Sequence, residues 1–288
     1  RRQRQMCIRD RSDGAHLTLK NGVTLSADTS SSMSGSPLFL KNGKKTPKVI
    51  IENAKLITKS NLIRVQKSAN QATIEIKDGL FDASSNRTVV RNATNSTVSI
   101  SGGTFTNWYF DDVNKLEDDK VAVVYSDGVK IQKIPSDYQA KIKDCNYYLT
   151  SDNLYDLIKE DYVTGKTIKI VGNVSCEYPN GNYFGNPSGN TPKTLTLDIA
   201  EDKTLSGKMP LGVAEVTVTG NVSSAEKFFV PATENYEVIV SSPTTESKKY
   251  TGMVKVDNAD AFVIWGGTSY PYTSVSAAIE AARTKSGS

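Results

Sequence analysis

The sequence predicts an all-β protein built as a parallel β-helix. Three observations favour this class: matched strand motifs recur at nearly equal intervals, each motif alternates apolar and polar residues, and glycine-containing corners separate the strands. The composition agrees with it, because only 38% of the 288 residues are hydrophobic and Thr, Ser, Asn and Gly are abundant, as is typical of strands and turns.

The repeat is clearest in three stretches: VIIENAKLI (49–57), TIEIKDGLF (73–81) and TVSISGGTF (97–105). A strand–corner–strand unit of this length cannot bury its apolar face alone, whereas stacked coils cover one another about 4.8 Å apart. Alternation alone also fits an antiparallel sandwich, but equal spacing favours the stacked arrangement. We therefore expect two internal ladders, each with steps of 25 and 24 residues, formed by Ile51, Ile76 and Ile100 and by Leu56, Phe81 and Phe105.

Further stretches show the same alternation of apolar and polar residues. An earlier coil, LTLKNGVTL (17–25) with PLFL (37–40), fits more loosely. In a second block, KIVGNVS (169–175) and TVTGNVS (217–223) are offset by 48 residues, twice the coil length, with TLTLDIA (194–200) between them. Between the blocks, VAVVY (121–125) and VKIQKI (129–134) predict a hairpin that caps the first block, since an open sheet edge invites aggregation.

Two stretches have helical periodicity. In 152–160, Leu154, Leu157 and Ile158 share a face, with Asp152 available as a cap. In 273–282, the apolar face is Val275, Ala278, Ile279 and Ala282. Leu154 matches Val275 and Ile158 matches Ile279 at a constant offset of 121, which predicts a larger repeat of strand, helix and coils. The same offset carries Thr167 to Ser288, so we expect an internal fragment whose final helix packs less well than the first.

The first eleven residues, RRQRQMCIRDR, resemble translated adapter read-through in a metagenomic fragment, and we expect them to be disordered. They carry five Arg and one Asp, and the remaining residues hold 30 basic and 30 acidic side chains. A neutral chain lacks the basic footprint of a nucleic-acid-binding protein. No apolar run is long enough for a membrane span. The expected domains are an artefact at 1–11, a first block at 12–110, a cap at 111–143, a second repeat at 144–255 and a truncated third repeat at 256–288.

The motifs IKDGLFDAS (76–84), VSISGGTFTN (98–107) and YTSVSAAIEAA (272–282) resemble those of large repetitive surface or secreted proteins of gut anaerobes, which carry pectin-lyase-like β-helix repeats. The resemblance covers nearly everything after residue 16. It implies a right-handed β-helix and an extracellular or cell-surface location. It specifies the fold and the location of such proteins and leaves the substrate open.

Residue patterns for catalysis are weak. β-Helix glycosidases need paired carboxylates on outward strand positions, yet the outward rows read Glu52, Lys77, Ser101 and Ile50, Glu75, Ser99. Histidine-dependent triads and metal sites are disfavoured, since His16 is the only histidine. The acidic pairs Asp111–Asp112 and Asp118–Asp119 are expected in a solvated loop, because their spacing lacks a calcium-loop pattern. We assign no catalytic residue, metal or cofactor.

The loop YPNGNYFGNPSGN (178–190) is the most suggestive segment, because aromatic side chains on a loop can stack on sugars. A carbohydrate site there would use Tyr178, Tyr183 and Phe184; the alternative is that these aromatics cover the flank of the scaffold. Cys145 and Cys176 can either pair or remain separate thiols, and their spacing does not decide between the two.

Three functions remain open. The leading hypothesis is a non-enzymatic structural or adhesin-like segment of a bacterial surface or secreted repeat protein. Its partners would be host or dietary glycans, or host surface proteins. The alternatives are a carbohydrate-binding module and a fragment of a β-helix polysaccharide lyase or hydrolase.

Overall fold

The computed structural model describes residues 6–8, 16–27, 35–40, 46–66, 71–83, 88–91, 93–159, 161–186, 191–255, 257, 259–265 and 268–286. The chain is mostly strands with few helices, so it belongs to the all-β class. It divides into two compact units. Unit 1 comprises 1–136 with 146–148, and unit 2 comprises 137–145 with 149–288.

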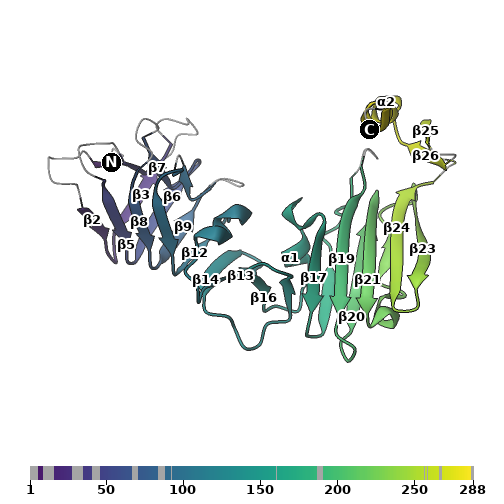
Figure 1. The fold of residues 1–288 in the computed structure, drawn as a ribbon, viewed down its shortest axis with the longest axis horizontal. Helices are drawn as coiled ribbons and strands as arrows, with labels where there is room; N and C mark the ends of the chain where they lie inside the picture. The colour runs from purple at the N-terminus through teal and green to yellow at the C-terminus, as the bar shows by residue number, and fades with distance from the viewer. Residues whose placement is uncertain are drawn as a thin grey trace. The chain divides into compact units, whose positions relative to one another are not determined.

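Unit 1 contains three sheets of parallel strands (Figure 1). The first is β2 (His16–Leu19), β5 (Lys48–Ile51), β8 (Thr73–Ile76) and β11 (Thr97–Ile100). The second is β3 (Thr24–Ala27), β6 (Ala54–Thr58), β9 (Gly79–Asp82) and β12 (Gly103–Phe105). The third is β1 (Met6–Ile8), β4 (Leu38–Leu40), β7 (Ile63–Val65) and β10 (Val90–Arg91). From β2 to β12, consecutive strands belong in turn to the first, second and third sheet, and this order repeats along the chain.

Strand β1 lies within the segment expected to be disordered. Met6–Ile8 pair in parallel with Leu38–Leu40, which extends the third sheet by one strand. Residues 1–5 and 9–11 lie outside the described part of the chain.

The register brings equivalent apolar residues side by side. Ile51 is the Cα partner of Ile76, which is in turn the partner of Ile100, and all three are buried. Leu56 pairs with Phe81, and Phe81 with Phe105. Successive residues of a strand point to opposite faces, so these columns line the interior while the residues between them face outward.

Glycine makes the corner between the first and second sheets. Gly79 and Gly103 adopt φ angles of +146° and +108°. A Cβ atom on Gly79 would lie 2.4 Å from the Ala54 carbonyl oxygen. The corner therefore needs glycine both for its backbone conformation and for the close approach of the neighbouring strand.

An antiparallel hairpin follows β12. β14 (Gly128–Gln132) pairs antiparallel with β12 and with β13 (Val121–Tyr125). Before it, the 3-10 helix η1 (Phe110–Lys115) crosses the end of the first sheet, where Ile100 bridges to Leu116. Strand β16 (Tyr147–Leu149) follows later in the chain.

Unit 2 is built around β17 (Lys166–Ile170), β19 (Lys193–Ile199) and β21 (Ala214–Gly220), which are parallel and lie side by side in Figure 1. β15 (Ala140–Ile142) joins β17 antiparallel. At the other edge, β24 (Ser247–Val254) and β23 (Tyr236–Thr244) continue the sheet antiparallel. A second sheet contains β18 (Val174–Glu177), β20 (Leu205–Leu211) and β22 (Phe229–Pro231). The 3-10 helices η2 (Asp161–Val163) and η3 (Val222–Ala225) connect strands.

The register of this sheet differs from the expected offset of 48. Ile168 pairs with Leu197 and Leu197 with Val218, so β17 and β21 are related by 50 residues. The expected and observed registers differ by two residues, and a two-residue shift keeps the same side chains on the buried face. The pattern of apolar alternation therefore could not distinguish between them.

The first helix buries Leu154, Leu157 and Ile158 as predicted, whereas the second packs through a different face. α1 (Tyr155–Ile158) is a single turn, and the Asn153 side-chain carbonyl, rather than Asp152, accepts from the Tyr155 N–H at its start. α2 (Val275–Ser286) packs on a hairpin of β25 (Ala261–Trp265) and β26 (Thr268–Tyr272). Of the predicted apolar face of α2, only Ala278 is buried, together with Ala277 and Ala281; the prediction is wrong for Val275, Ile279 and Ala282, which are exposed. Small side chains allow the helix to lie close to the hairpin.

Candidate functional site

The outward face of the sheet β2–β5–β8–β11 carries the residues among which a pair of carboxylates was sought in the sequence. The Lys48 ammonium lies 2.7 Å from a Glu75 carboxylate oxygen, and Lys77 lies 3.8 Å from Glu52. On the next strand, the Ser99 hydroxyl donates to Glu117 over 2.8 Å. Carboxylates of neighbouring strands thus meet lysines or a hydroxyl, and the arrangement stabilises the stack rather than forming an acid pair.

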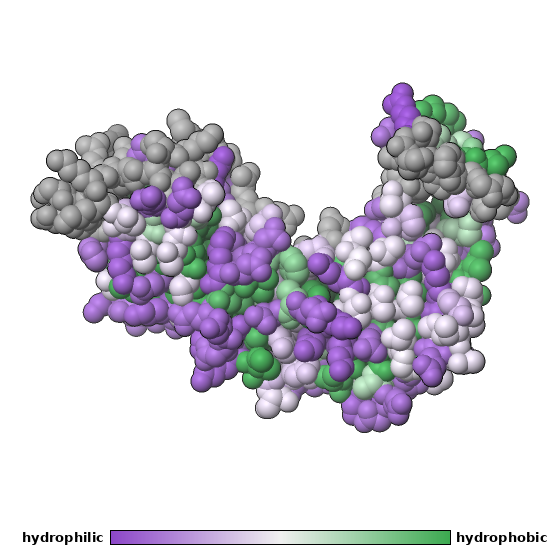
Figure 2. Space-filling view, viewed as in Figure 1, coloured by the Kyte–Doolittle hydropathy of each residue, from purple (hydrophilic) through white to green (hydrophobic). Residues whose placement is uncertain are grey.

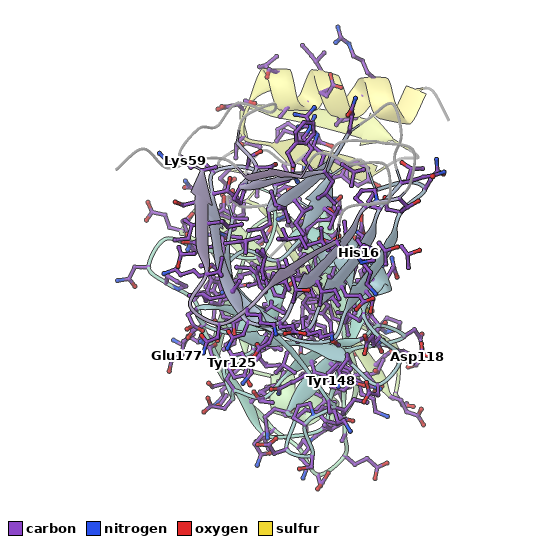
Figure 3. All side chains as sticks on the ribbon, turned by 90° about the vertical axis from the view of Figure 1, so that its left-hand side faces the viewer. His16, Lys59, Asp118, Tyr125, Tyr148 and Glu177 are labelled. Atoms are coloured by element: carbon purple, nitrogen blue, oxygen red, sulfur yellow. The ribbon has the colours of Figure 1, made fainter. Side chains whose placement is uncertain are left out.

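The interior beneath this face is aromatic toward η1. The rings of Phe105 and Trp108 meet edge to face with centroids 4.7 Å apart, and both side chains are buried. Phe110 lies 5.2 Å from the Tyr147 ring. Trp108 therefore packs over Phe105. His16, the only histidine of the sequence, lies exposed at the first position of β2 (Figure 3).

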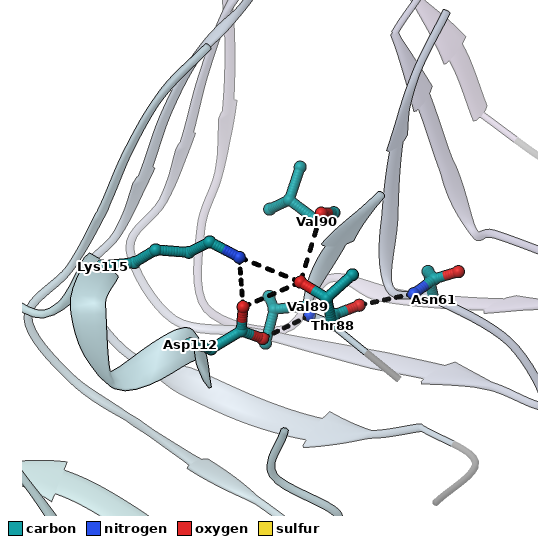
Figure 4. A network of polar contacts seen from close by, with 6 residues as sticks. All are labelled: Asn61, Thr88, Val89, Val90, Asp112 and Lys115. Carbon is teal, nitrogen blue, oxygen red and sulfur yellow. Dashed lines mark hydrogen bonds and ion pairs between the residues drawn. The ribbon is translucent and has the colours of Figure 1, made fainter. Parts of the chain in front are cut away.

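Of the two acidic pairs, Asp111–Asp112 and Asp118–Asp119, only Asp112 is buried. Asp112, expected in a solvated loop, is fully buried and forms an ion pair with Lys115 (Figure 4). Its carboxylate also accepts from the Val89 N–H at 2.6 Å and from the Thr88 hydroxyl at 2.8 Å. This pair was not predicted from the sequence, although the i,i+3 spacing of Asp112 and Lys115 could have indicated it. The network attaches η1 to the coil beneath it, a structural role.

The other acidic pair is on the surface. Asp119 lies 3.3 Å from the Lys120 ammonium and 3.6 Å from that of Lys133. The hydrogen bond from Lys120 lowers the pKa of the Asp119 carboxyl, and Lys133 acts in the same direction. Within the described ranges, no three His, Cys, Asp or Glu side chains are grouped closely enough to hold a metal ion.

The aromatic loop is described up to residue 186, and positions 187–190 lie outside the described residues. Its three aromatic side chains go to different places. Phe184 is only 4% exposed and bridges to Leu211, with its N–H donating to the Pro210 carbonyl at 2.9 Å. A buried ring of this kind is not available to stack on a sugar, so Phe184 serves the core.

The two tyrosines remain half-buried and lie on separate neighbours. The Tyr178 ring meets Tyr155 of α1 edge to face at 4.7 Å. Tyr183 lies over Gly212, where an added Cβ atom would come within 2.5 Å of the ring, and its centroid is 6.0 Å from that of Tyr236. The structure thus does not gather the three predicted residues into one platform; it leaves two tyrosines as the candidates for ligand contact.

Burial is the main cause of the raised pKa values of Tyr178 and Tyr236. It raises the pKa of Tyr178, with smaller contributions from Cys176 and Tyr155. Burial and the neighbouring Tyr183 raise the pKa of Tyr236 to about 12. These phenols remain protonated at neutral pH, so they act as hydrogen-bond donors and apolar surfaces.

The cysteines are not joined to each other. Cys145 and Cys176 both lie among the described residues, and no disulfide links them. Cys176 is buried in β18, where desolvation and the nearby Glu177 raise the pKa of its thiol to about 12. A thiol in this state is a poor nucleophile at neutral pH, which indicates a packing role.

These features define an all-β protein in which parallel strands are stacked in register and several carboxylates of the described residues form ion pairs with lysines. No family model, curated protein or solved structure matches the chain. Among the described elements, no helix combines the length and apolar character needed to cross a bilayer.

Proposed function

We propose that the protein is a structural or adhesive segment of a bacterial cell-surface or secreted repeat protein, and that unit 1 winds as a parallel β-helix. The observation that carries the proposal is the register of the stack. Equivalent residues of successive strands pair in parallel in three sheets, and consecutive strands visit those sheets in rotation. Each added coil buries its neighbour, so such a stack makes a long, rigid element from short repeated sequence.

The polar surface supports a scaffold role. Lys48 with Glu75 and Lys77 with Glu52 form ion pairs between neighbouring strands, so these carboxylates are engaged in holding coils together. The charge balance of the chain beyond its first eleven residues is neutral. A neutral outer face suits contact with glycans or with other proteins, for which strong electrostatic steering is not required.

Deleting one coil tests the winding. Thr73 is the Cα partner of Thr97, so removing residues 73–96 joins equivalent positions of adjacent coils. We expect this variant to remain folded, with β11 amides protected from hydrogen exchange by pairing with β5. Removing residues 73–84 instead deletes half a coil and should abolish that protection. Equal loss of structure in both variants would refute the parallel winding.

Adhesion and catalysis are separated by a second experiment. Beads coated with the full chain are applied to arrays of mucin and plant-cell-wall glycans and to host cells, and retention is measured. The same chain is incubated with pectic and host glycans, with and without calcium. Retention without product supports the proposal; release of unsaturated or reducing-end products by the chain would establish the polysaccharide-degrading alternative in its place.

Carbohydrate binding through the 178–186 loop is the second candidate. It is favoured by the position of Tyr183, which is half-buried and lies over Gly212, so part of its ring remains accessible. Tyr183→Ala should reduce glycan retention at least about fivefold if this ring contacts sugar, while Tyr125→Ala in the β13–β14 hairpin serves as a matched control. Unchanged retention in Tyr183→Ala would remove this candidate and leave the scaffold role intact.

A further inference from the structure

The chain contains two related hairpin–helix elements, separated by 121 residues. In the first element, β15 is followed by β16, which ends at Leu149, and then by α1. In the second, β25 and β26 are followed by α2. Both hairpins close with the same type of bond. The Gln139 N–H donates to the Leu149 carbonyl at 2.7 Å, and the Asp260 N–H donates to the Tyr272 carbonyl at 2.9 Å. The donors are 121 residues apart and the acceptors 123, so the second hairpin is two residues longer, and the elements are compared at β15 with β25 and at their helices.

In the first element, the outer edge of β15 is covered. β17 pairs with it antiparallel, aligning Ala140 with Ile170 and Ile142 with Ile168. The Lys143 N–H donates to the Thr167 carbonyl at 2.8 Å and extends the ladder. The pairing leaves the two isoleucines of β17 buried beside the hairpin.

The helix of the first element is covered as well. Leu154 and Ile158 are 0% and 2% exposed. The Leu154 N–H donates to the Ser175 carbonyl of β18 at 2.7 Å, and the Ser175 N–H returns a bond to the Asp152 carbonyl at 2.6 Å. The strand that follows β17 thus seals the beginning of α1.

The second element has no such cover within the described residues. β25 pairs with β26 along one edge, and no described strand pairs with its other edge. Val275 and Ile279, which match Leu154 and Ile158, are 58% and 50% exposed. On the opposite face of β25, Ile264 is 73% exposed. Hydrophobic residues are visible on the surface of this element in Figure 2.

We propose that the free edge of β25, together with Val275 and Ile279, is a docking surface for a β-coil of the β17–β18 type. The occupant adds a strand antiparallel to β25, with apolar residues at alternate positions, and the strand after it covers the helix. The proposal rests on the same interface being formed once already in this chain, and on the matching apolar residues left exposed. An unpaired strand edge beside an apolar helix face is a natural site for strand addition.

The exposed positions 275 and 279 of α2 carry apolar side chains. An exposed helix face needs no Val and Ile at four-residue spacing, and a lone helix would carry polar residues there. Burying two such side chains stabilises a complex through the removal of apolar surface from water. The inference depends on the internal repeat and is independent of the adhesive role proposed above.

An extended chain tests the proposal. The full chain is followed by a second copy of residues 162–220, which supplies β17 to β21 with the turn that precedes β17. Ile279→Cys serves as a reporter, and its alkylation is followed by site-resolved mass spectrometry together with hydrogen exchange of β25. We expect alkylation at position 279 to slow about tenfold or more, and the β25 amides to become protected, because opening would then require undocking.

The matched control carries Ile168→Asp and Ile170→Asp in the appended copy only, and it should label and exchange like the parent chain. Unchanged labelling and exchange in the unmodified extension would overturn the proposal, whether or not the appended segment folds by itself. The parent chain is also examined by sedimentation over a range of concentrations. Self-association that protects position 279 would identify a second copy as the occupant and would equally overturn it.

Discussion

The rings of Phe81 and Phe105 stack with their centroids 4.6 Å apart and their planes inclined by 18°. This separation is close to the spacing of about 4.8 Å between neighbouring strands, because the two residues are Cα partners in β9 and β12. The stack continues to the edge of Trp108. A column of this kind converts the backbone register into direct contact between side chains of neighbouring strands.

Shortening this column should destabilise unit 1. Phe81→Ala removes a fully buried ring and leaves a cavity between Leu56 and Phe105, so we expect a loss of about 3–5 kcal/mol in the free energy of unfolding. Leu80→Ala, at the neighbouring exposed position, should change it by less than about 0.5 kcal/mol. Urea denaturation followed by circular dichroism measures both. Equal effects would show that the ring stack does not support the fold.

Substitution of the corner glycine should be costly for a separate reason. Gly79 combines a φ of +146° with a Cβ position 2.4 Å from the Ala54 carbonyl oxygen, so Gly79→Ala forces the coils apart. We expect a loss of at least about 3 kcal/mol. Gly22 also has a positive φ, of +86°, but its Cβ would meet no atom within 4 Å, so Gly22→Ala should cost only about 1 kcal/mol. Thermal denaturation of the two variants compares crowding with backbone strain.

The buried carboxylate of Asp112 should be necessary for attaching η1. Asp112→Ala leaves the Val89 N–H and the Lys115 ammonium without this acceptor, and we expect a loss of about 2–4 kcal/mol. Asp111→Ala, at the adjacent exposed position, is the control and should change stability by less than about 0.5 kcal/mol. Hydrogen exchange at Val89 reports the local effect. Protection of that amide in Asp112→Ala would contradict the assigned role.

The thiol of Cys176 should make the fold sensitive to alkaline pH. Its pKa is raised from 9.0 to about 12 in the folded protein, so between these values the unfolded chain loses a proton that the folded chain retains. Stability is therefore unaffected by this group below about pH 9 and falls as the pH rises from there toward 12. The slope is at most about 1.4 kcal/mol per pH unit. Cys176→Ala should reduce the slope between pH 9 and 11.

Alkylation at pH 8 gives an independent measurement of the same site. Site-resolved mass spectrometry should find Cys176 labelled far more slowly than the half-buried Cys145, and equally fast in urea. Rapid labelling of Cys176 in the folded chain would show that the thiol is accessible, and the alkaline window would then have another origin.

Spacing and alternation explain how much of the fold was predictable. The separation of Ile51, Ile76 and Ile100 specifies which residues are neighbours, because a parallel stack repeats its register at each coil. The same reasoning cannot separate registers that differ by two residues, as the pairing of Ile168 with Leu197 demonstrates. In that case turn lengths decide the register, and composition does not reveal them.

The candidate site was less predictable, since exposure depends on what packs against a residue. The loop 178–190 indicated three aromatics, yet β20 takes Phe184 into the core and leaves the two tyrosines apart. Asp112 looked like a loop residue because the sequence does not show that η1 folds back onto Val89. In α2, helical periodicity indicated Val275 and Ile279, whereas close packing on Tyr272 selects the alanines.

The reversal of strand direction beside β12 and β21 has a consequence for how the length of such proteins changes over generations. β14 and β24 present an antiparallel hydrogen-bond pattern, so the next copy of the same coil is not templated beyond them. A duplication or loss of DNA encoding one whole 24-residue step, such as that from Thr73 to Thr97, changes the stack by one strand spacing, about 4.8 Å, and leaves the terminal hairpins untouched. The length of the stack is then a heritable dimension that recombination adjusts in discrete increments.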